Sequence, residues 1–140
     1  MAEEKSDEDL LQELLREHNI EEMVKFDEFS IQEKLQNNAY KIVQYKELYI
    51  REKIQLDKLI SLKEKIIGEQ YDYYRFSYDK ELRPQEITTY YLPKDEKIIQ
   101  INKIIRKQEQ RVEFFNLCVD ALSKQAWNMK SFIEVHKVGI

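Results

Sequence analysis

The sequence is poor in residues that break helices and in residues that bind metals or cross-link chains. It contains two glycines, two prolines, two histidines and one cysteine among 140 residues. Two glycines cannot build a glycine-rich phosphate-binding loop, and a single cysteine excludes an intrachain disulfide. The widely scattered positions of Cys118, His18 and His136 do not match metal-ligand spacing. We therefore predict no metal site and no cofactor.

Long hydrophobic runs and an excess of basic residues are also missing. No apolar stretch approaches the roughly 20 residues of a membrane span, and the acidic N-terminus is unlike a secretion signal. We therefore expect a cytoplasmic protein. The pI of about 5.4 argues against a highly basic nucleic-acid binder. This pI does not exclude weaker nucleic-acid binding by a local basic strip that is repeated in each subunit of an oligomer.

Acidic residues are numerous, but they do not indicate catalysis. Charged residues make up 36% of the chain, so carboxylates at helical spacing are expected on solvated helix faces. No glycosidase-like or other acid/base site stands out from this background. We therefore predict that the protein is not an enzyme.

Negative charge is concentrated at the N-terminus. Residues 1–29 hold three Lys/Arg and eleven Asp/Glu, whereas the other 111 residues hold 20 Lys/Arg and 16 Asp/Glu. This predicts an acidic N-terminal arm, residues 1–29, and a single helical domain, residues 30–140. A capping-box pattern of Ser6 with Asp9 opens a short amphipathic helix from Asp7 to His18. The arm either packs on the domain or docks on a protein partner.

A long helix is predicted from residue 30 to residue 74. Ser30 and Glu33 form a capping-box pattern, and strong helix formers follow. Apolar residues recur on one side at Leu35, Ala39, Ile42, Tyr49, Leu56, Ile60 and Ile67. The part up to Gly68 would be about 57 Å long, but a compact chain of this size is only about 37 Å across. A second chain is expected to cover the overhanging apolar face, which predicts a homo-oligomer.

The periodicity then changes, and residues 75–92 are predicted to form a β-hairpin. Tyr74, Phe76 and Tyr78 alternate with polar residues, as in a strand. Arg83-Pro84 is typical of a turn. The segment 87–92 is rich in β-branched and aromatic residues, which predicts the second strand.

Two further helices are predicted after Pro93. Asp95 can cap a second long amphipathic helix, residues 95–124, and a C-terminal helix follows at residues 126–137. The expected fold is mainly α: two long amphipathic helices with an inserted β-hairpin, a short acidic N-terminal helix and a C-terminal oligomerisation helix.

The end of the long helix is the candidate functional site. Five of the eight residues from 71 to 78 are aromatic, against 11% for the chain, and lysines precede them. Cations that follow phosphates and rings that stack on bases are typical of single-stranded nucleic-acid binding. The candidate residues are Lys58, Lys63, Lys65, Tyr73, Tyr74 and Arg75. Alternatively, the tyrosines fill a core and the protein is a purely structural helical scaffold that binds no nucleic acid.

The order of several short segments resembles the UvsY recombination mediators of T4-like bacteriophages. The first part of the match comprises Asn37-Asn38, Asp72-Tyr73-Tyr74 and Phe76-Ser77. The second part lies in an ungapped tail and comprises Phe114, the run 119–122, Trp127, Met129, Lys130 and Phe132. The resemblance covers most of the chain after the acidic arm.

This resemblance implies a specific role in DNA recombination, repair and replication. Such proteins bind single-stranded DNA, engage the phage single-strand-binding protein and help a RecA-like recombinase (UvsX-like) to replace it on the strand in the host cytoplasm. They are not enzymes, and they form hexameric or heptameric rings through their C-terminal region. The implied subunit interface here comprises Trp127, Met129, Phe132 and Ile133.

One segment departs from the family pattern. The family carries a basic Lys-Ala-Arg-Leu element just before Asp-Tyr-Tyr, and this chain has Gly68-Glu69-Gln70-Tyr71 there. The family's basic site is therefore not carried over to this chain. Two alternatives follow: the cations lie instead at Lys63, Lys65 and Arg75, or the positive charge is weaker in this protein. A second candidate strip on the next helix comprises Lys103, Arg106, Lys107 and Arg111.

Overall fold

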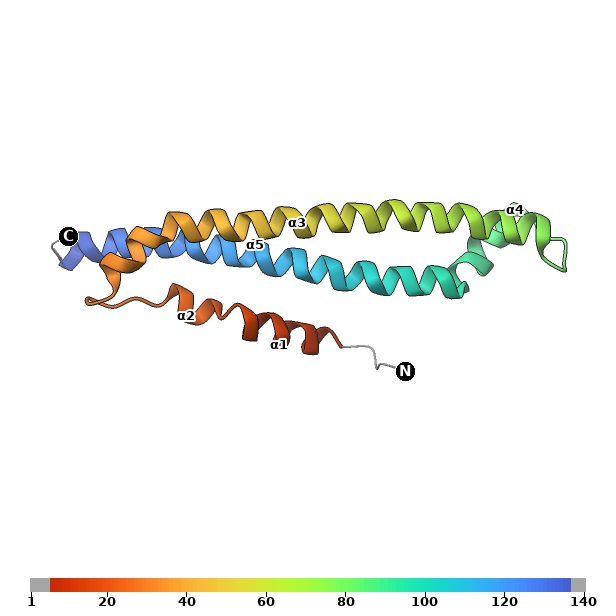
Figure 1. The fold of residues 1–140 in the computed structure, drawn as a ribbon. Helices are drawn as coiled ribbons and strands as arrows, with labels where there is room; N and C mark the ends of the chain where they lie inside the picture. The colour runs from red at the N-terminus through yellow and green to blue at the C-terminus, as the bar shows by residue number, and fades with distance from the viewer. Residues whose placement is uncertain (1–5, 137–140) are drawn as a thin grey trace. The chain divides into compact units, whose positions relative to one another are not determined.

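The computed structural model describes residues 6–136 and contains no β-strand within that range. The chain divides into two compact units: unit 1 holds the residues up to Glu52 and those from Gln110 onward, and unit 2 is Lys53–Glu109. Two long helices, α3 (Ile31–Asp72) and α5 (Glu96–His136), contribute to both units. Within each unit their segments run antiparallel (Figure 1).

Unit 1 begins with two short helices, α1 (Asp7–Glu17) and α2 (Ile20–Val24). The predicted capping box is confirmed: the Ser6 hydroxyl accepts from the Asp9 N–H at 3.1 Å, and the Asp9 carboxylate accepts from the Ser6 N–H at 3.3 Å. An isolated helix of this length is marginal in water, so packing has to hold it. Leu10 and Leu14 provide that packing because both are buried. Residues 1–5 of the predicted arm lie outside the described residues.

The core of unit 1 is formed where α1, α3 and α5 meet. Its buried apolar side chains are Leu10, Leu14, Tyr45, Phe114, Phe115, Cys118 and Leu122. The Tyr45 hydroxyl lies 2.9 Å from Nδ1 of His18, whose ring packs edge-on against Phe115. His18 therefore packs against the core of unit 1.

Buried amides set the register of the unit 1 helices. Asn38 Nδ2 donates to the Leu122 carbonyl at 2.8 Å and to Gln125 Oε1 at 3.2 Å. Gln125 Nε2 in turn donates to the Met23 carbonyl at 2.8 Å. A shift of either long helix would leave these buried groups unsatisfied, which specifies one alignment of α2, α3 and α5.

The start of α3 differs from the predicted capping box at Ser30. The Ser30 hydroxyl accepts from the Asp27 N–H at 2.9 Å instead. Asp27 is the capping group of this turn, because its carboxylate accepts the N–H groups of Phe29 and Ser30 at 2.9 and 2.8 Å. A carboxylate accepts such bonds more strongly than a hydroxyl does, and the hydrogen bonds from Ser30 lower the pKa of Asp27.

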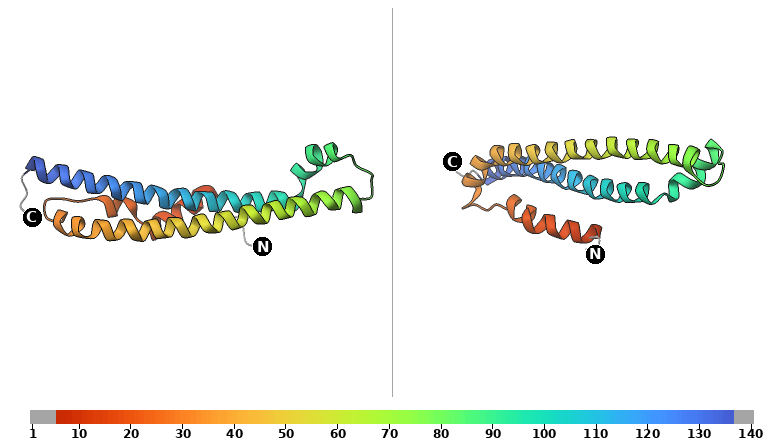
Figure 2. Two further views of the ribbon diagram at one scale, coloured as in Figure 1. Left: turned by 90° about the horizontal axis from the view of Figure 1, so that it is seen from above. Right: turned by 45° about the vertical axis from the view of Figure 1, so that its right-hand side comes forward.

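The predicted β-hairpin at residues 75–92 is wrong. Helix α3 leads into a π-helical turn, η1 (Tyr73–Ser77), and three short helical segments follow a loop (Figure 2). They are α4 (Pro84–Glu86), the π-helical η2 (Ile87–Tyr91) and η3 (Leu92–Lys94).

Two features of that segment favour helix over strand. Pro84 occupies the first helical position, where its missing N–H costs nothing, rather than a turn between strands. Ile87 is completely buried and Tyr91 is half-buried one helical turn later, whereas Tyr90 is 63% exposed. The burial of side chains four residues apart in the folded protein, Ile87 and Tyr91, thus outweighs the β propensity of the β-branched and aromatic residues.

The two helices predicted at residues 95–124 and 126–137 form the single helix α5. The predicted cap is confirmed, since Asp95 Oδ1 accepts from the Ile98 N–H at 3.1 Å. No glycine or proline separates the two predicted segments, and Gln125 is held by the amide network. The predicted last residue, Lys137, lies outside the described residues. Among residues 6–136, no helix is long and apolar enough to cross a membrane.

Candidate nucleic-acid interface

Four tyrosine rings from separate segments of unit 2 form one cluster. Tyr74 of η1 lies 5.2 Å from Tyr73, 5.4 Å from Tyr78 and 5.4 Å from Tyr91 of η2, measured between ring centroids. Tyr78 lies 5.5 Å from Tyr91. The rings meet edge to face or tilted, which is the arrangement that aromatic quadrupoles prefer. This cluster joins η1 to η2.

Asp95 is the polar anchor of the cluster. It is 5% exposed, and its Oδ2 accepts from the Tyr74 hydroxyl at 2.7 Å and from Gln70 Nε2 at 2.8 Å. Burial would raise the pKa of Asp95, but these bonds and two backbone N–H groups outweigh burial and lower it. Burial, together with the hydrogen bond and charge of Asp95, raises the pKa of Tyr74 to about 12. The Tyr74 hydroxyl is therefore structural and uncharged.

An open hollow of about 580 Å³ lies against this cluster. We call it the tyrosine hollow, and its lining residues are Tyr73, Tyr74, Tyr78, Glu86, Tyr90, Tyr91 and Lys94. Its volume lies within the range of small-ligand sites, about 300–1,000 Å³. Tyr73 and Tyr90 are 47% and 63% exposed, so their rings are accessible to a ligand. Lys94 is also exposed.

The loop beside the hollow is held by Arg75. Its guanidinium donates to the Leu82 carbonyl at 2.9 Å, and Leu82 is buried. An arginine has five N–H donors, so this contact leaves donors for a phosphate. Arg75, a predicted site residue, thus has a structural role already.

The three predicted lysines do not share one side of α3. Lys58 and Lys65 are seven residues apart and exposed, and they differ by only about 20° around the helix. Lys63 is half-buried and lies about 140° from Lys58. We call Lys58 and Lys65 the lysine pair.

The four basic residues of the second candidate strip are divided between the two units. Arg111 belongs to unit 1, where its guanidinium lies 3.0 Å from the Glu52 carboxylate, and both groups are partly buried. The hydrogen bond to Glu52 raises the pKa of Arg111. Lys103 and Arg106 are exposed in unit 2, and Lys107 is half-buried.

Residues 68–71, which stand where the family has its Lys-Ala-Arg-Leu element, have other roles in this chain. Gln70 donates to Asp95, and Glu69 lies 4.0 Å from Lys65 across one helical turn. Gly68 lies inside α3, and a methyl group placed on it would meet nothing within 4 Å. The helix continues past Gly68 to Asp72, close to the predicted end at residue 74.

The predicted interface residues on α5 differ in accessibility. Trp127 is 71% exposed and Ile133 is half-buried, but Met129 is completely buried within unit 1. Phe132 packs edge-on against Phe26 at 5.7 Å. Val135 is 75% exposed and was not among the predicted residues.

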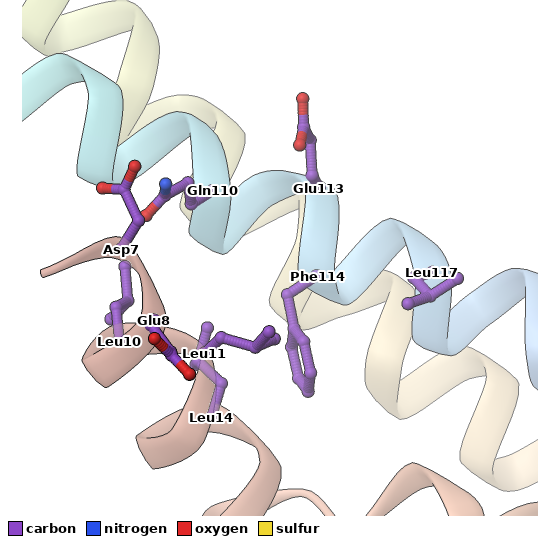
Figure 3. Close-up of a pocket in the computed structure, with 9 residues that line it drawn as sticks. All are labelled: Asp7, Glu8, Leu10, Leu11, Leu14, Gln110, Glu113, Phe114 and Leu117. Atoms are coloured by element: carbon purple, nitrogen blue, oxygen red, sulfur yellow. The ribbon is translucent and has the colours of Figure 1, made fainter.

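Another hollow, of about 400 Å³, lies between α1 and α5 in unit 1. Figure 3 shows the leucines of α1 opposite Phe114 of α5. Asp7, Glu8 and Glu113 also line it, and their negative charge repels phosphates. This surface is therefore unsuited to DNA.

The sequence pattern missed Tyr90, Tyr91, Glu86 and Lys94 as lining residues. In the predicted hairpin, Tyr90 and Tyr91 would lie on opposite faces, and Glu86 and Lys94 would lie outside the strand. The short helices α4, η2 and η3 instead bring all four residues to the tyrosines of residues 73–78. The available signal was composition, since six of nine tyrosines fall between residues 71 and 91.

Comparison with known protein families gives one match. Residues 5–139 match the family described as UvsY, recombination, repair and ssDNA binding protein UvsY. Searches of curated proteins and of solved structures find no match. The match covers nearly the whole chain, including both units and the tyrosine-rich segment. The chain therefore belongs to the UvsY family of recombination, repair and single-stranded-DNA-binding proteins.

Proposed function

We propose that this protein is a recombination mediator that loads a RecA-like recombinase onto single-stranded DNA covered by single-strand-binding protein. The observation that carries the proposal is the family match over residues 5–139. The mediator acts by binding and presenting the strand, without catalysing a reaction, in the host cytoplasm.

The lysine pair and the exposed rings of unit 2 support a path for the strand. Lys58 and Lys65 project from one side of α3 and attract phosphates, while Tyr73 offers an exposed ring. Unit 2 holds 12 Lys/Arg and 10 Asp/Glu, so its net charge is only +2. A single subunit of this charge binds weakly.

Assembly into a ring overcomes this weakness. Each subunit repeats the same lysines and rings, so a strand that touches several subunits gains affinity by avidity without a tight single site. A strand bent along such a ring loosens its single-strand-binding protein and is presented to the recombinase.

The first test is fluorescence anisotropy of a labelled single-stranded oligonucleotide, with a duplex of equal length, at low and at physiological salt. We expect the protein to prefer the single strand. Replacing Lys58 and Lys65 by Ala should weaken binding and flatten its salt dependence by about 0.7 in slope per lost phosphate contact. The matched control replaces Lys46 and Lys53, which are also exposed on α3 and seven residues apart but lie on another side. An equal loss in both double variants would remove the lysine pair as the specific site.

The mediator step needs a separate assay. The protein is added to a strand saturated with single-strand-binding protein, and recombinase filament formation is followed. Faster filament formation is the expected result. Strand binding without any acceleration would contradict the loading role, and absence of strand binding at low salt would favour a purely structural scaffold.

A further inference from the structure

We propose that the tyrosine hollow of unit 2 receives one unpaired nucleobase, which stacks on Tyr73 and Tyr90 while Lys94 holds the adjoining phosphate. This inference rests on the proposed function, because it names the part of a single strand that this site takes. It adds Tyr90 and Lys94 to a predicted site that contained Tyr73 and Tyr74 but no residue of η2 or η3.

The lining of the hollow suits a flat aromatic ligand. Five of its seven lining residues are tyrosines, and Tyr73 and Tyr90 are the most exposed of these five. Every base has a π-face, so stacking on such rings is tolerant of sequence.

The ring cluster beneath makes the hollow rigid before any ligand arrives. Tyr74 and Tyr91 are in ring contact at 5.4 Å, and the Tyr74 hydroxyl is anchored on Asp95 at 2.7 Å. A preformed site loses less conformational entropy on binding than one that must order its side chains.

The charges at the edge fit a nucleotide. Lys94 supplies a cation for the phosphate next to the base. Glu86 is the one carboxylate in the lining, and its charge is partly offset because it accepts from the Arg83 N–H at 3.4 Å and lies 3.7 Å from the Arg83 guanidinium. Its remaining acceptor capacity suits an amino or imino group on a base edge.

This site accounts for selection of single strands by stereochemistry rather than by charge. In a duplex the bases are stacked and paired, so none enters the hollow without unstacking that costs a few kcal/mol. The lysine pair, by contrast, attracts the phosphates of either form.

The test compares two short labelled oligonucleotides of equal length and charge, one with normal bases and one with abasic residues throughout. For the full-length wild-type protein, the normal oligonucleotide should bind about 5- to 150-fold more tightly. Tyr90→Ala should remove most of this difference and leave the salt slope unchanged, whereas Tyr90→Phe should retain it. The matched control is Tyr40→Ala, because Tyr40 is 69% exposed and lies in unit 1.

The outcomes separate this inference from the proposed function. Equal binding of the two oligonucleotides by the wild type would overturn base recognition but leave strand binding intact. Retention of the base preference in both Tyr90→Ala and Tyr73→Ala would place the bases elsewhere. Binding of neither oligonucleotide would overturn the proposed function together with the inference.

Discussion

At the scale of single residues, the Tyr74–Asp95 hydrogen bond links the stability of unit 2 to pH. The lowered pKa of Asp95 means that its contribution to the free energy of unfolding is fully present above the ordinary carboxyl pKa of 3.8. That contribution is lost as the pH falls through the lower folded-state pKa. The raised pKa of Tyr74 acts at the other end, where stability is lost as the pH rises from 10 towards about 12.

Replacing Tyr74 by Phe should therefore destabilise the protein in a pH-dependent way. We expect a loss of about 1–2 kcal/mol in the free energy of unfolding at pH 7, because a bond to a buried carboxylate is removed. The loss should shrink at acid pH, where Asp95 is neutral. The alkaline dependence should weaken without vanishing, because burial also raises the pKa values of Tyr45 and Cys118. Urea unfolding at fixed protein concentration measures both effects, with Tyr40→Phe as the exposed control. A loss that is the same at every pH would contradict this account.

Asn38 allows a second test at this scale. Asn38→Ala removes two buried hydrogen bonds and leaves Gln125 Oε1 without this donor, so we expect a loss of about 1–3 kcal/mol in the free energy of unfolding. Asn37→Ala is the matched control, since Asn37 is exposed and should change the free energy by no more than about 0.5 kcal/mol. Equal denaturation midpoints for the two variants would show that the amide network does not stabilise unit 1.

At the scale of elements, a glycine inside a long helix is a point of weakness. Gly68 lies within α3, and the space around it is open. Gly68→Ala should raise the free energy of unfolding by about 0.5–1 kcal/mol, because alanine loses less backbone entropy in a helix. Thermal and urea unfolding check this. A destabilised Gly68→Ala variant would argue against this explanation.

Local sequence patterns predict some helical elements of this protein better than others. The helix starts at Ser6 and Asp95 were predictable, because a capping residue acts on N–H groups two or three positions away. The conformation of residues 75–92 was not predictable in this way, because it depends on the burial of Ile87 and on ring contacts of Tyr91 with Tyr74 and Tyr78 across the segment. Lys63 shows the related problem for a site: its type suits DNA, but its position on α3 leaves it half-buried.

At the scale of the whole molecule, exposed apolar side chains on α5 support assembly through this helix. Leu117, Trp127 and Val135 are 56–75% exposed and lie within an arc of about 80° around it. These exposed apolar side chains on one side of a helix are the residues that we propose for the subunit interface. Met129 contributes to the stability of the subunit instead, because it is already buried.

Trp127→Ala combined with Val135→Ser should therefore release smaller species in sedimentation velocity experiments. The reason is that both side chains lose apolar contact area without disturbing the core of unit 1. Phe76→Ala, which changes an equally exposed ring in unit 2, should sediment like the wild type. If the double variant sediments as the full oligomer, the subunit interface lies elsewhere.

The sequence by itself determined that the chain is mainly helical, where α1 and α5 begin, and to which family it belongs. These properties depend on periodicity, capping residues and the order of short segments, all of which are local or linear. The tertiary structure alone decided that residues 75–92 are helical, that Met129 faces inward and that Tyr90 joins Tyr73 around one hollow. The physical reason is that burial and ring contacts depend on segments far apart in the chain, and no local pattern specifies those neighbours.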